Sequence, residues 1–477
     1  MTSPGGPSVG LALIVKDGAD DLPNLLKSVE GAFDQVVLLD TGSTDQTKSV
    51  FRKWAKQEKE HHPDFHWLVD DYKWIDDFAD ARNTADGLLN TDWLVWADAD
   101  DEILGAGNLR ALAANAPDDL AAYVCGYDYA RDAHDNCACY LRRERLVRRG
   151  KGMWTSRVHE SQLVAGRQQD VGPDTVLWRH LKQDVGDSSE RNRRILERWV
   201  EDEPENPRVL SYLGTEHLVV GDHEKAMPFF ERYLDLRTGW DEERAQVHRK
   251  LSQCLNVLGD HEKAVDVALM AVDLMPEWPD SYLSLAEAYH QTGKYEKAVF
   301  WCDRLLEAGK PDTLLIINPL DYTLQPLLIK SSALGGLARW DEAIEVAEKA
   351  LAMNPDQPDV RNTVAAWQAS SMREATAKTW CAATVQLIGT DEQWKALRLI
   401  EDTVPGFATD HPEIVQLRSQ VRERVRPLID PNLYREHYEI GGSKPEDFIA
   451  DDVVDEVAGR LPRAAFLLEG VKEQMAA

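Results

Sequence analysis

The stretch that decides the fold is Trp93-Leu94-Val95-Trp96-Ala97, which is followed at once by Asp98-Ala99-Asp100. The apolar run predicts a buried β-strand. Side chains alternate along an extended backbone, so Asp98 and Asp100 can point toward one ligand. Carboxylates at the end of a strand suit Mg²⁺ or Mn²⁺, which bind through carboxylates together with substrate phosphates. We therefore expect a divalent-cation site here, with the next acids, Asp101 and Glu102, as solvated turn residues.

Two further apolar runs precede this strand, at Val9–Val15 and at Val36–Leu39, and the second ends at Asp40. Continuous runs of this kind are typical of strands buried on both faces. Apolar residues at helical spacing follow each run, with Ser43 or Thr44 as the expected N-cap of one helix. This alternation predicts an α/β domain with a parallel sheet, helices on both sides, and ligands beyond the carboxyl ends of the strands.

Four segments, in this order, closely resemble family 2 glycosyltransferases of the GT-A fold, and most of all the bacterial and phage-type members that carry tetratricopeptide repeats. The segments are Leu13-Ile14-Val15-Lys16-Asp17, Leu39-Asp40-Thr41-Gly42-Ser43-Thr44-Asp45, Asp77-Phe78-Ala79-Asp80-Ala81-Arg82-Asn83 and Trp96-Ala97-Asp98-Ala99-Asp100-Asp101-Glu102. The resemblance covers roughly residues 8–185. It implies a nucleotide-sugar donor, Mn²⁺ or Mg²⁺ on the Asp-x-Asp motif, and usually inversion at the anomeric carbon.

The donor side of the predicted site has four residues. Asp40 can accept hydrogen bonds from a nucleobase or ribose, or it can cap the following helix. Arg82 matches the family's Ala-Arg-Asn segment and suits a pyrophosphate, although it can instead pair with Asp77 or Asp80. Asp98 faces the ribose, or the metal through water, and Lys16 completes the donor-binding set.

Two histidines and one acid complete the predicted site around Asp100, the best metal ligand. The resemblance places His180 near the metal or the pyrophosphate; the alternative is a purely structural histidine. The segment ending at Val158-His159-Glu160 resembles the Val-His-Glu segment of family members that carry repeats. Glu160 is the candidate general base for the acceptor hydroxyl. His159 is the alternative base or a neighbour of the metal, and a solvated pair stays possible.

A basic stretch precedes this segment, and its arginines can face the donor phosphates, an acidic acceptor or solvent. It comprises Arg142, Arg143, Arg145, Arg148, Arg149 and Lys151.

After residue 186 the pattern becomes a helical repeat. Gly259 and Gly293 occupy corresponding positions 34 residues apart, which is the tetratricopeptide period. Such repeats stack into a solenoid that can bind an extended peptide or a second copy of the chain. We expect the solenoid to recruit the acceptor and to leave the chemical step to the first domain. An inserted apolar loop, Ile316–Tyr322, is a candidate interface.

Composition limits the remaining classes of protein. The chain has 477 residues and a net charge of −29, which disfavours nucleic acid as a partner. No apolar run reaches the ~20 residues of a membrane helix, and the first eight residues lack the features of a signal peptide. The six cysteines show no zinc-type spacing. We therefore expect reduced thiols, no integral membrane segment and a cytoplasmic location.

These observations predict an α/β GT-A nucleotide-sugar-binding domain followed by an all-α solenoid of the tetratricopeptide type. The expected division is a disordered N-terminus at 1–8, the GT-A domain at 9–186, a connecting helix at 187–204, repeats at 205–355 and a helical C-terminal region at 356–477. The predicted function is metal-dependent, inverting glycosyl transfer of the hexosyltransferase type, from a nucleotide-sugar to a protein or peptide held by the repeats. A homo-oligomer could form through the repeats. The alternative is a repeat scaffold whose transferase-like domain is inactive or only senses a nucleotide-sugar.

Overall fold

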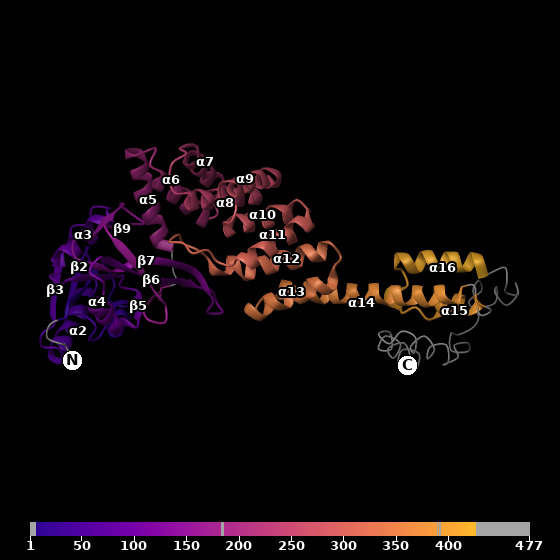
Figure 1. Ribbon diagram of the computed structural model, residues 1–477, viewed down its shortest axis with the longest axis horizontal. Helices are drawn as coiled ribbons and strands as arrows, with labels where there is room; N and C mark the ends of the chain where they lie inside the picture. The colour runs from indigo at the N-terminus through magenta and orange to yellow at the C-terminus, as the bar shows by residue number, and fades with distance from the viewer. Residues whose placement is uncertain (1–5, 183–185, 389, 391–392, 426–477) are drawn as a thin grey trace. The chain divides into compact units, whose positions relative to one another are not determined.

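The computed structural model describes residues 6–182, 186–388, 390 and 393–425. The chain divides into two compact units, the first ending at Ala333 and the second beginning at Leu334 (Figure 1). The first unit contains a β-sheet with its helices and then paired helices; the described part of the second unit is helical. Ser8, which we expected within a disordered N-terminus, is bonded to Asp92 through its backbone nitrogen and its hydroxyl, both at 2.8 Å.

Four parallel strands form one half of the sheet in the order β3-β2-β1-β4. They are β1 (Val9–Val15), β2 (Gln35–Asp40), β3 (His66–Asp71) and β4 (Trp93–Ala97). Three of them are the apolar runs of the sequence, and their parallel pairing confirms that part of the prediction. β3 was not predicted, because it is an edge strand with no fully buried side chain and therefore has no apolar run.

The other half of the sheet is mixed, so the expected all-parallel sheet was wrong beyond β4. β7 (Cys137–Arg148) runs antiparallel to both β4 and β6 (Leu120–Arg131). The short connection between β6 and β7 makes a hairpin, which forces antiparallel pairing. β11 (Leu177–His180) lies between β6 and β5 (Asp101–Leu104). The remaining strands are β10 (Arg167–Val171), paired with β6, and the separate pair β8 (Gly152–Thr155) and β9 (Ser161–Val164).

Short helices connect the strands of this domain. They are α1 (Leu22–Ser28), α2 (Thr47–His61), α3 (Phe78–Leu88), the single turn η1 (Ala106–Asn108) and α4 (Leu109–Ala114). α2 begins at Thr47, so neither Ser43 nor Thr44 is its N-cap. Both residues instead bind the turn after β1: Ser43 Oγ accepts from the Asp17 nitrogen at 2.9 Å, and the Thr44 nitrogen donates to Asp17 Oδ1 at 2.6 Å.

The connecting helix α5 (Gly186–Asp202) leads into three helix pairs of the first unit. The pairs are α6 (Pro207–Val219) with α7 (His223–Asp235), α8 (Asp241–Val257) with α9 (His261–Leu274), and α10 (Pro279–Gln291) with α11 (Tyr295–Ala308). The helices α12 (Leu324–Gly336) and α13 (Trp340–Met353) follow along the chain. The turn inside each pair needs a left-handed residue. Glycine supplies it at Gly221, Gly259 and Gly293, with φ of 77°, 87° and 70°, whereas the turn between α12 and α13 has Ala338 at 56°.

An insertion between α11 and α12 packs against the sheet of the first domain. Ile317 forms an antiparallel bridge with Tyr140 of β7, through N–O distances of 2.8 and 2.9 Å. The insertion ends in a short helical turn, η2 (Pro319–Tyr322), and hydrogen bonds also tie it to α8 and α10. Ile316 is 41% exposed, but Ile317 is buried. The loop that we took for a candidate interface therefore joins the repeats to the chain's own β7.

Arginines of the basic stretch make hydrogen bonds within the protein, although Arg149 and Lys151 are exposed. Arg142 and Arg143 donate to the carbonyls of Thr313 and Leu314 in the insertion, at 3.2 and 3.1 Å. Arg145 is fully buried. The arginines at positions 148 and 149 donate to main-chain carbonyls of neighbouring segments.

The second unit continues with α14 (Pro358–Leu387), α15 (Gln393–Asp402), η3 (Gly406–Ala408) and α16 (Pro412–Val425). Its core gathers around Trp380, Ala396 and Ile400. The part of the expected helical C-terminal region that follows residue 425 lies outside the described residues. Within the described part of the chain, no helix is both long enough and apolar enough to cross a membrane.

Candidate functional site

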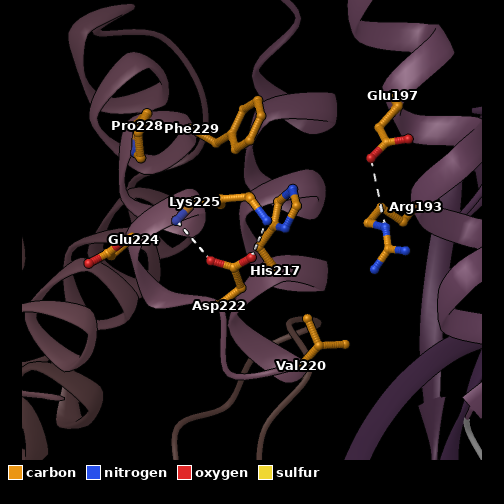
Figure 2. A pocket seen from close by; sticks show the side chains of 9 residues that line it. All are labelled: Arg193, Glu197, His217, Val220, Asp222, Glu224, Lys225, Pro228 and Phe229. Atoms are coloured by element: carbon orange, nitrogen blue, oxygen red, sulfur yellow. Dashed lines mark hydrogen bonds and ion pairs between the residues drawn. The ribbon is translucent and has the colours of Figure 1, made fainter. Parts of the chain in front are cut away.

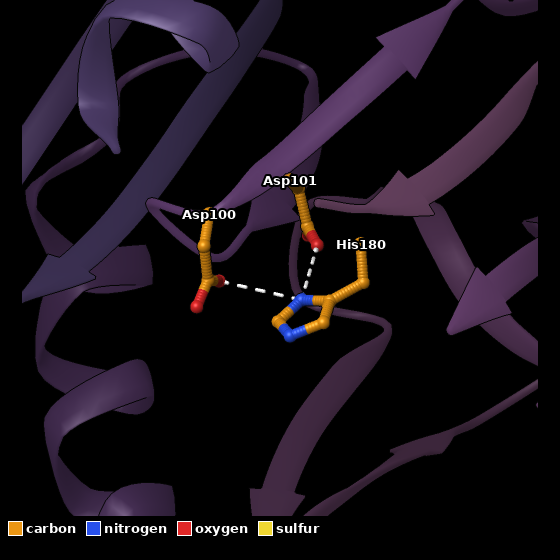
Figure 3. A group of neighbouring side chains, drawn as sticks. All are labelled: Asp100, Asp101 and His180. Carbon is orange, nitrogen blue, oxygen red and sulfur yellow. Dashed lines mark ion pairs between the residues drawn. The ribbon is translucent and has the colours of Figure 1, made fainter. Parts of the chain in front are cut away.

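The end of β4 and the end of β11 together form a cluster of two carboxylates and an imidazole. β5 begins at Asp101, and its antiparallel register with β11 places His180 directly opposite that residue. His180 Nδ1 lies 3.5 Å from Asp100 Oδ1 and 3.5 Å from Asp101 Oδ1 (Figure 3). Ligand atoms of Asp100, Asp101 and His180 all lie within 4.8 Å of one another, which makes this cluster a candidate metal site.

Asp101 is a buried member of this cluster, which corrects its sequence interpretation as a solvated turn acid. Its side chain is 0% exposed and accepts a hydrogen bond from the Tyr127 hydroxyl at 2.6 Å. Its other oxygen accepts from the Asp98 nitrogen at 3.0 Å and lies 3.9 Å from Arg145 Nη1. Neighbours from β6 and β7 thus stabilise the buried charge. Glu102, the other acid that we expected to be a solvated turn residue, is half-buried, and its Oε2 lies 3.7 Å from Arg179 Nη1.

The electrostatics of the cluster fit a hard divalent cation. Burial, together with the charge of Asp98, raises the pKa of Asp100 to about 6. Burial lowers the pKa of His180, but its contacts with Asp101 and Asp100 outweigh that effect and raise it. Carboxylates held this close repel one another, and a bound cation would relieve that repulsion. Oxygen ligands with one imidazole are an accepted donor set for Mn²⁺, and carboxylates alone suit Mg²⁺.

Arg82 joins two of the predicted site residues. Its Nε donates to Glu160 Oε1 at 2.6 Å and its Nη2 donates to Asp98 Oδ1 at 2.8 Å. The guanidinium lies over the rings of Trp96 and Trp154, at 4.4 and 5.0 Å from their centroids. Burial raises the pKa of Asp98 and is the largest single effect, but the charge and hydrogen bond of Arg82 together with the charges of Arg145 and His180 outweigh it, so the net shift is downward.

The alternative partners that we considered for Arg82 are engaged elsewhere. Asp77 caps its own helix by accepting from the Asp80 nitrogen at 3.0 Å, and Asp80 also accepts from the Tyr72 hydroxyl.

Asp40 shapes the turn after β2 and does not cap helix α2, whose N-cap is Gln46. Its Oδ1 accepts from the backbone nitrogens of Gly42 and Ser43, at 2.8 and 2.6 Å, and so shapes the turn after β2. Its Oδ2 is buried, has no hydrogen-bond partner, and lies 3.6 Å from Lys48 Nζ. A ligand donor could therefore still bind Oδ2. Lys16 is exposed directly after β1.

The His159 side chain contacts the first helix of the repeats and is not part of the Asp100–Asp101–His180 cluster. Its Nε2 lies 3.0 Å from Glu216 Oε1 on α6, and its ring stacks on Tyr212 of the same helix with centroids 4.4 Å apart. The side chain of Glu160, the next residue, instead accepts the hydrogen bond from Arg82 Nε. The structure thus places Asp98, Arg82 and Glu160 in one network and Asp100, Asp101 and His180 in another, with Asp98 and Asp101 linking the two.

Sequence reasoning missed Tyr127 and Arg145, which hold Asp101, and Glu216, which holds His159. Arg145 stood within the basic stretch, where the sequence does not distinguish a fully buried arginine from the partly exposed ones beside it. Glu216 had one usable signal: it is an acid at a buried position of a helix whose other buried residues are largely apolar.

A separate pocket of about 660 Å³ lies between α5 and the α6–α7 pair (Figure 2). Its lining residues are Arg193, Glu197, His217, Val220, Asp222, Glu224, Lys225, Pro228 and Phe229. His217 stacks on Phe229 with ring centroids 5.7 Å apart. The lining contains no predicted site residue, so the pocket is distinct from the acid cluster.

Comparison with known proteins identifies two segments of the chain. Residues 12–152 match the family described as glycosyl transferase family 2, and residues 279–308 match a tetratricopeptide repeat. The resemblance inferred from the four sequence segments and the repeats is thus confirmed. The chain carries a family 2 glycosyltransferase domain of the GT-A type followed by a tetratricopeptide solenoid.

Two curated relatives each name one of these two features. A TPR repeat-containing protein of Synechococcus elongatus is 30% identical over 242 residues, which cover 47% of this chain and 56% of that protein. The prophage-derived glycosyltransferase SunS of Bacillus subtilis is 22% identical over 263 residues, or 53% of this chain and 59% of SunS. The chain spans somewhat more than half the length of these relatives.

Among solved structures, MamA aligns with a TM-score of 0.29 and 18% identity, over 36% of this chain and 86% of MamA. The TPR protein YrrB aligns with a TM-score of 0.30 and 14% identity, over 37% of this chain and 84% of YrrB.

Proposed function

We propose that this chain is a metal-dependent glycosyltransferase. It moves a sugar, of the hexose class, from a nucleotide-sugar donor to a protein or peptide acceptor, with inversion at the anomeric carbon. The observation that carries the proposal is the Arg82 bridge between Asp98 and Glu160 beside the Asp100–Asp101–His180 cluster. This bridge puts a candidate base next to a candidate metal site in a domain of the matching family.

Asp100, Asp101 and His180 would hold the cation, with Asp98 close by. A divalent cation bound there supplies Lewis-acid stabilisation of the charge on the leaving nucleoside diphosphate. The chain's own contribution is to orient these ligands. Tyr127 and the Asp98 nitrogen fix the two oxygens of Asp101, and stacking on Tyr129, with ring centroids 4.7 Å apart, fixes the plane of His180.

Glu160 is the proposed general base, in preference to His159. Arg82 occupies only its Oε1, and within the described residues Oε2 makes no hydrogen bond, so this oxygen is open to an acceptor hydroxyl. The Glu160 side chain is 12% exposed, which shields the proton transfer from bulk water. His159 already has Glu216 and Tyr212 as partners. An inverting transfer in one displacement needs one such base on the acceptor side.

Donor binding is proposed for Asp40, Lys16, Asp98 and Arg82. The buried Oδ2 of Asp40 stands at the carboxyl end of β2, where parallel sheets bind their ligands. Arg82 donates to Glu160 through its Nε and to Asp98 through its Nη2, so its proposed part in donor binding is to hold Asp98 in place.

The repeats support a polypeptide acceptor, because tetratricopeptide solenoids present extended surfaces for peptides. The division at 9–186, 187–204 and 205–355, and oligomerisation through the repeats, stay predictions. A cytoplasmic location is also proposed, because all six cysteines are free, as is usual in a reducing compartment.

The test is hydrolysis of a panel of nucleotide-sugars by the full chain, with and without Mn²⁺, followed by transfer to candidate peptides. We expect slow release of one nucleoside diphosphate that depends on Mn²⁺ or Mg²⁺. Donor binding without any turnover would instead support the alternative, a repeat scaffold with a sugar-sensing domain.

A further inference from the structure

We propose that the first helix of the repeats, α6, sets the position of the Ser156–Glu160 loop and thereby of the proposed base. The two positioning residues are Arg208 and Glu216. This inference rests on the proposed function of Glu160, and it changes our expectation that the repeats leave the chemical step alone.

The loop has a backbone that needs support from outside. Two of its non-glycine residues have positive φ, Ser156 at 80° and His159 at 50°. Each such residue costs of order 1–3 kcal/mol, and the conformation persists only where surrounding contacts determine it. The strained position at His159 directly precedes Glu160, so a change of backbone there would move the carboxylate.

α6 supplies contacts to both the main chain and the side chain of His159. Arg208 Nη2 donates to the His159 carbonyl at 2.6 Å. Glu216 Oε1 lies 3.0 Å from the imidazole Nε2, and Tyr212 stacks on the ring with an angle of 11° between the planes. Arg208 also lies over the Tyr212 ring, 5.0 Å from its centroid. Three residues of one helix therefore fix one residue of the loop.

The rest of the loop is anchored in the same region. Val158 is buried in an apolar cluster with residues of α5 and α6, namely Ile195, Leu196, Trp199, Val209 and Leu213. Arg157 pairs with Asp202 at the end of α5, at 2.8 Å, and its carbonyl accepts from the Phe78 nitrogen at the start of α3. The loop thus lies between the helix that carries Arg82 and the first helices that follow the sheet domain.

The geometry makes Glu216 and Arg208 positioning residues rather than catalytic ones. Both contact His159, one residue away from the proposed base, and Arg82 holds that base from the opposite side at 2.6 Å. Displacements of about 1 Å in a catalytic group can reduce turnover by about a hundredfold. Loss of the α6 contacts should therefore affect turnover without affecting the donor site.

The experiment compares four variants of the full chain. Glu216→Ala and Arg208→Ala each remove one contact with His159. Glu216→Gln keeps an oxygen that can accept from the imidazole and serves as the conservative rescue. Glu243→Ala is the matched control, because Glu243 is also a glutamate of a repeat helix and accepts a hydrogen bond from the Tyr233 hydroxyl at 3.1 Å, away from the Ser156–Glu160 loop.

Two readouts are needed. Hydrogen exchange, followed by mass spectrometry, reports on the amides of residues 157–160 and requires no substrate. Steady-state hydrolysis of the nucleotide-sugar that the wild type accepts gives kcat and KM. For Glu216→Ala and Arg208→Ala we expect exchange about tenfold faster in the loop, and kcat lower by about tenfold or more with donor KM unchanged. Glu216→Gln and Glu243→Ala should stay near wild type in both.

Unchanged exchange in both alanine variants would overturn the inference, and so would faster exchange with unchanged kcat. A rise in donor KM alone would also overturn it, because that would assign the contacts to donor binding. A wild type that hydrolyses no nucleotide-sugar would refute the proposed function; the exchange readout would then still decide whether α6 holds the loop.

Discussion

Replacement of Arg82 by methionine tests the centre of the site. Arg82→Met keeps an unbranched side chain at this position but removes the guanidinium, and with it the charge that joins Asp98 to Glu160 and the contacts with Trp96 and Trp154. The Arg82 side chain is 7% exposed, and its two ion pairs measure 2.6 and 2.8 Å. Loss of one partner from a buried pair costs about 3–5 kcal/mol, because a charge is left without compensation. Asp98 is 35% exposed, so water can solvate it in part, and we expect the lower end, about 3 kcal/mol.

The assay is thermal unfolding followed by tryptophan fluorescence and circular dichroism. For the compact unit that ends at Ala333, about 3 kcal/mol corresponds to a fall in Tm of roughly 4–5 °C. Arg110→Met is the matched control, because Arg110 pairs with Asp34 at 2.5 Å with both side chains about one third exposed. That variant should lose at most about 1 kcal/mol. Equal losses of stability in the two variants, or full glycosyl transfer by Arg82→Met, would refute the reasoning.

Four further outcomes are expected. Asp100→Asn should abolish metal-dependent donor hydrolysis and weaken Mn²⁺ binding in calorimetry while the fold is kept, because the metal loses a charged ligand; activity in excess chelator would contradict this. Glu160→Gln should lose transfer to the acceptor but keep nucleotide binding, since a base acts on the nucleophile; loss of nucleotide binding would place Glu160 on the donor side. Burial, and the nearby Arg244, lower the pKa of His248 to about 4. Between this pKa and the ordinary histidine pKa of about 6.5, the unfolded chain binds a proton at His248 that the folded chain does not bind. Wild-type stability should therefore fall by up to about 3 kcal/mol as the pH drops from about 6.5 to about 4. His248→Leu should flatten that part of the profile of stability against pH. Ala338→Gly should stabilise the second unit by about 0.5–1 kcal/mol, because Ala338 has a φ of 56° where the other repeats have glycine; the same change at the buried helical Ala343 should destabilise it.

The sequence predicted best where the chemistry is local. A strand that is buried on both faces appears in the sequence as a run of apolar residues. The predicted bounds of β1, β2 and β4 therefore agree with the structure to within one residue. The turns of the repeats carry glycine because one residue of each turn has a positive φ. The helix pairs were predicted from the spacing of these glycines along the sequence. Edge strands such as β3 have no such run, because solvent covers at least one of their faces.

The candidate site could be predicted only in part, because its partnerships are long-range. Asp98, Asp100 and Glu160 were chosen from motifs, but Asp101 became a buried cluster member only through β11 and Tyr127, which come from other strands. The contact between His159 and Glu216 joins residues 57 positions apart. The residues around Glu216 in the sequence do not indicate that its partner is His159. Tertiary packing determines which side chains come into contact.

The contact between β7 and the insertion also has a consequence for synthesis of the chain. Arg142 and the Thr313 carbonyl, which it binds, are 171 residues apart. A ribosome that adds about 5–20 residues per second needs roughly 10–30 s to cover that interval. During this time the tip of the β6–β7 hairpin has been made, but its hydrogen-bonding groups at Tyr140 lack the strand that will cover them. Until the insertion after the third helix pair has emerged, the backbone groups of Tyr140 that it binds must be satisfied by water or by another partner.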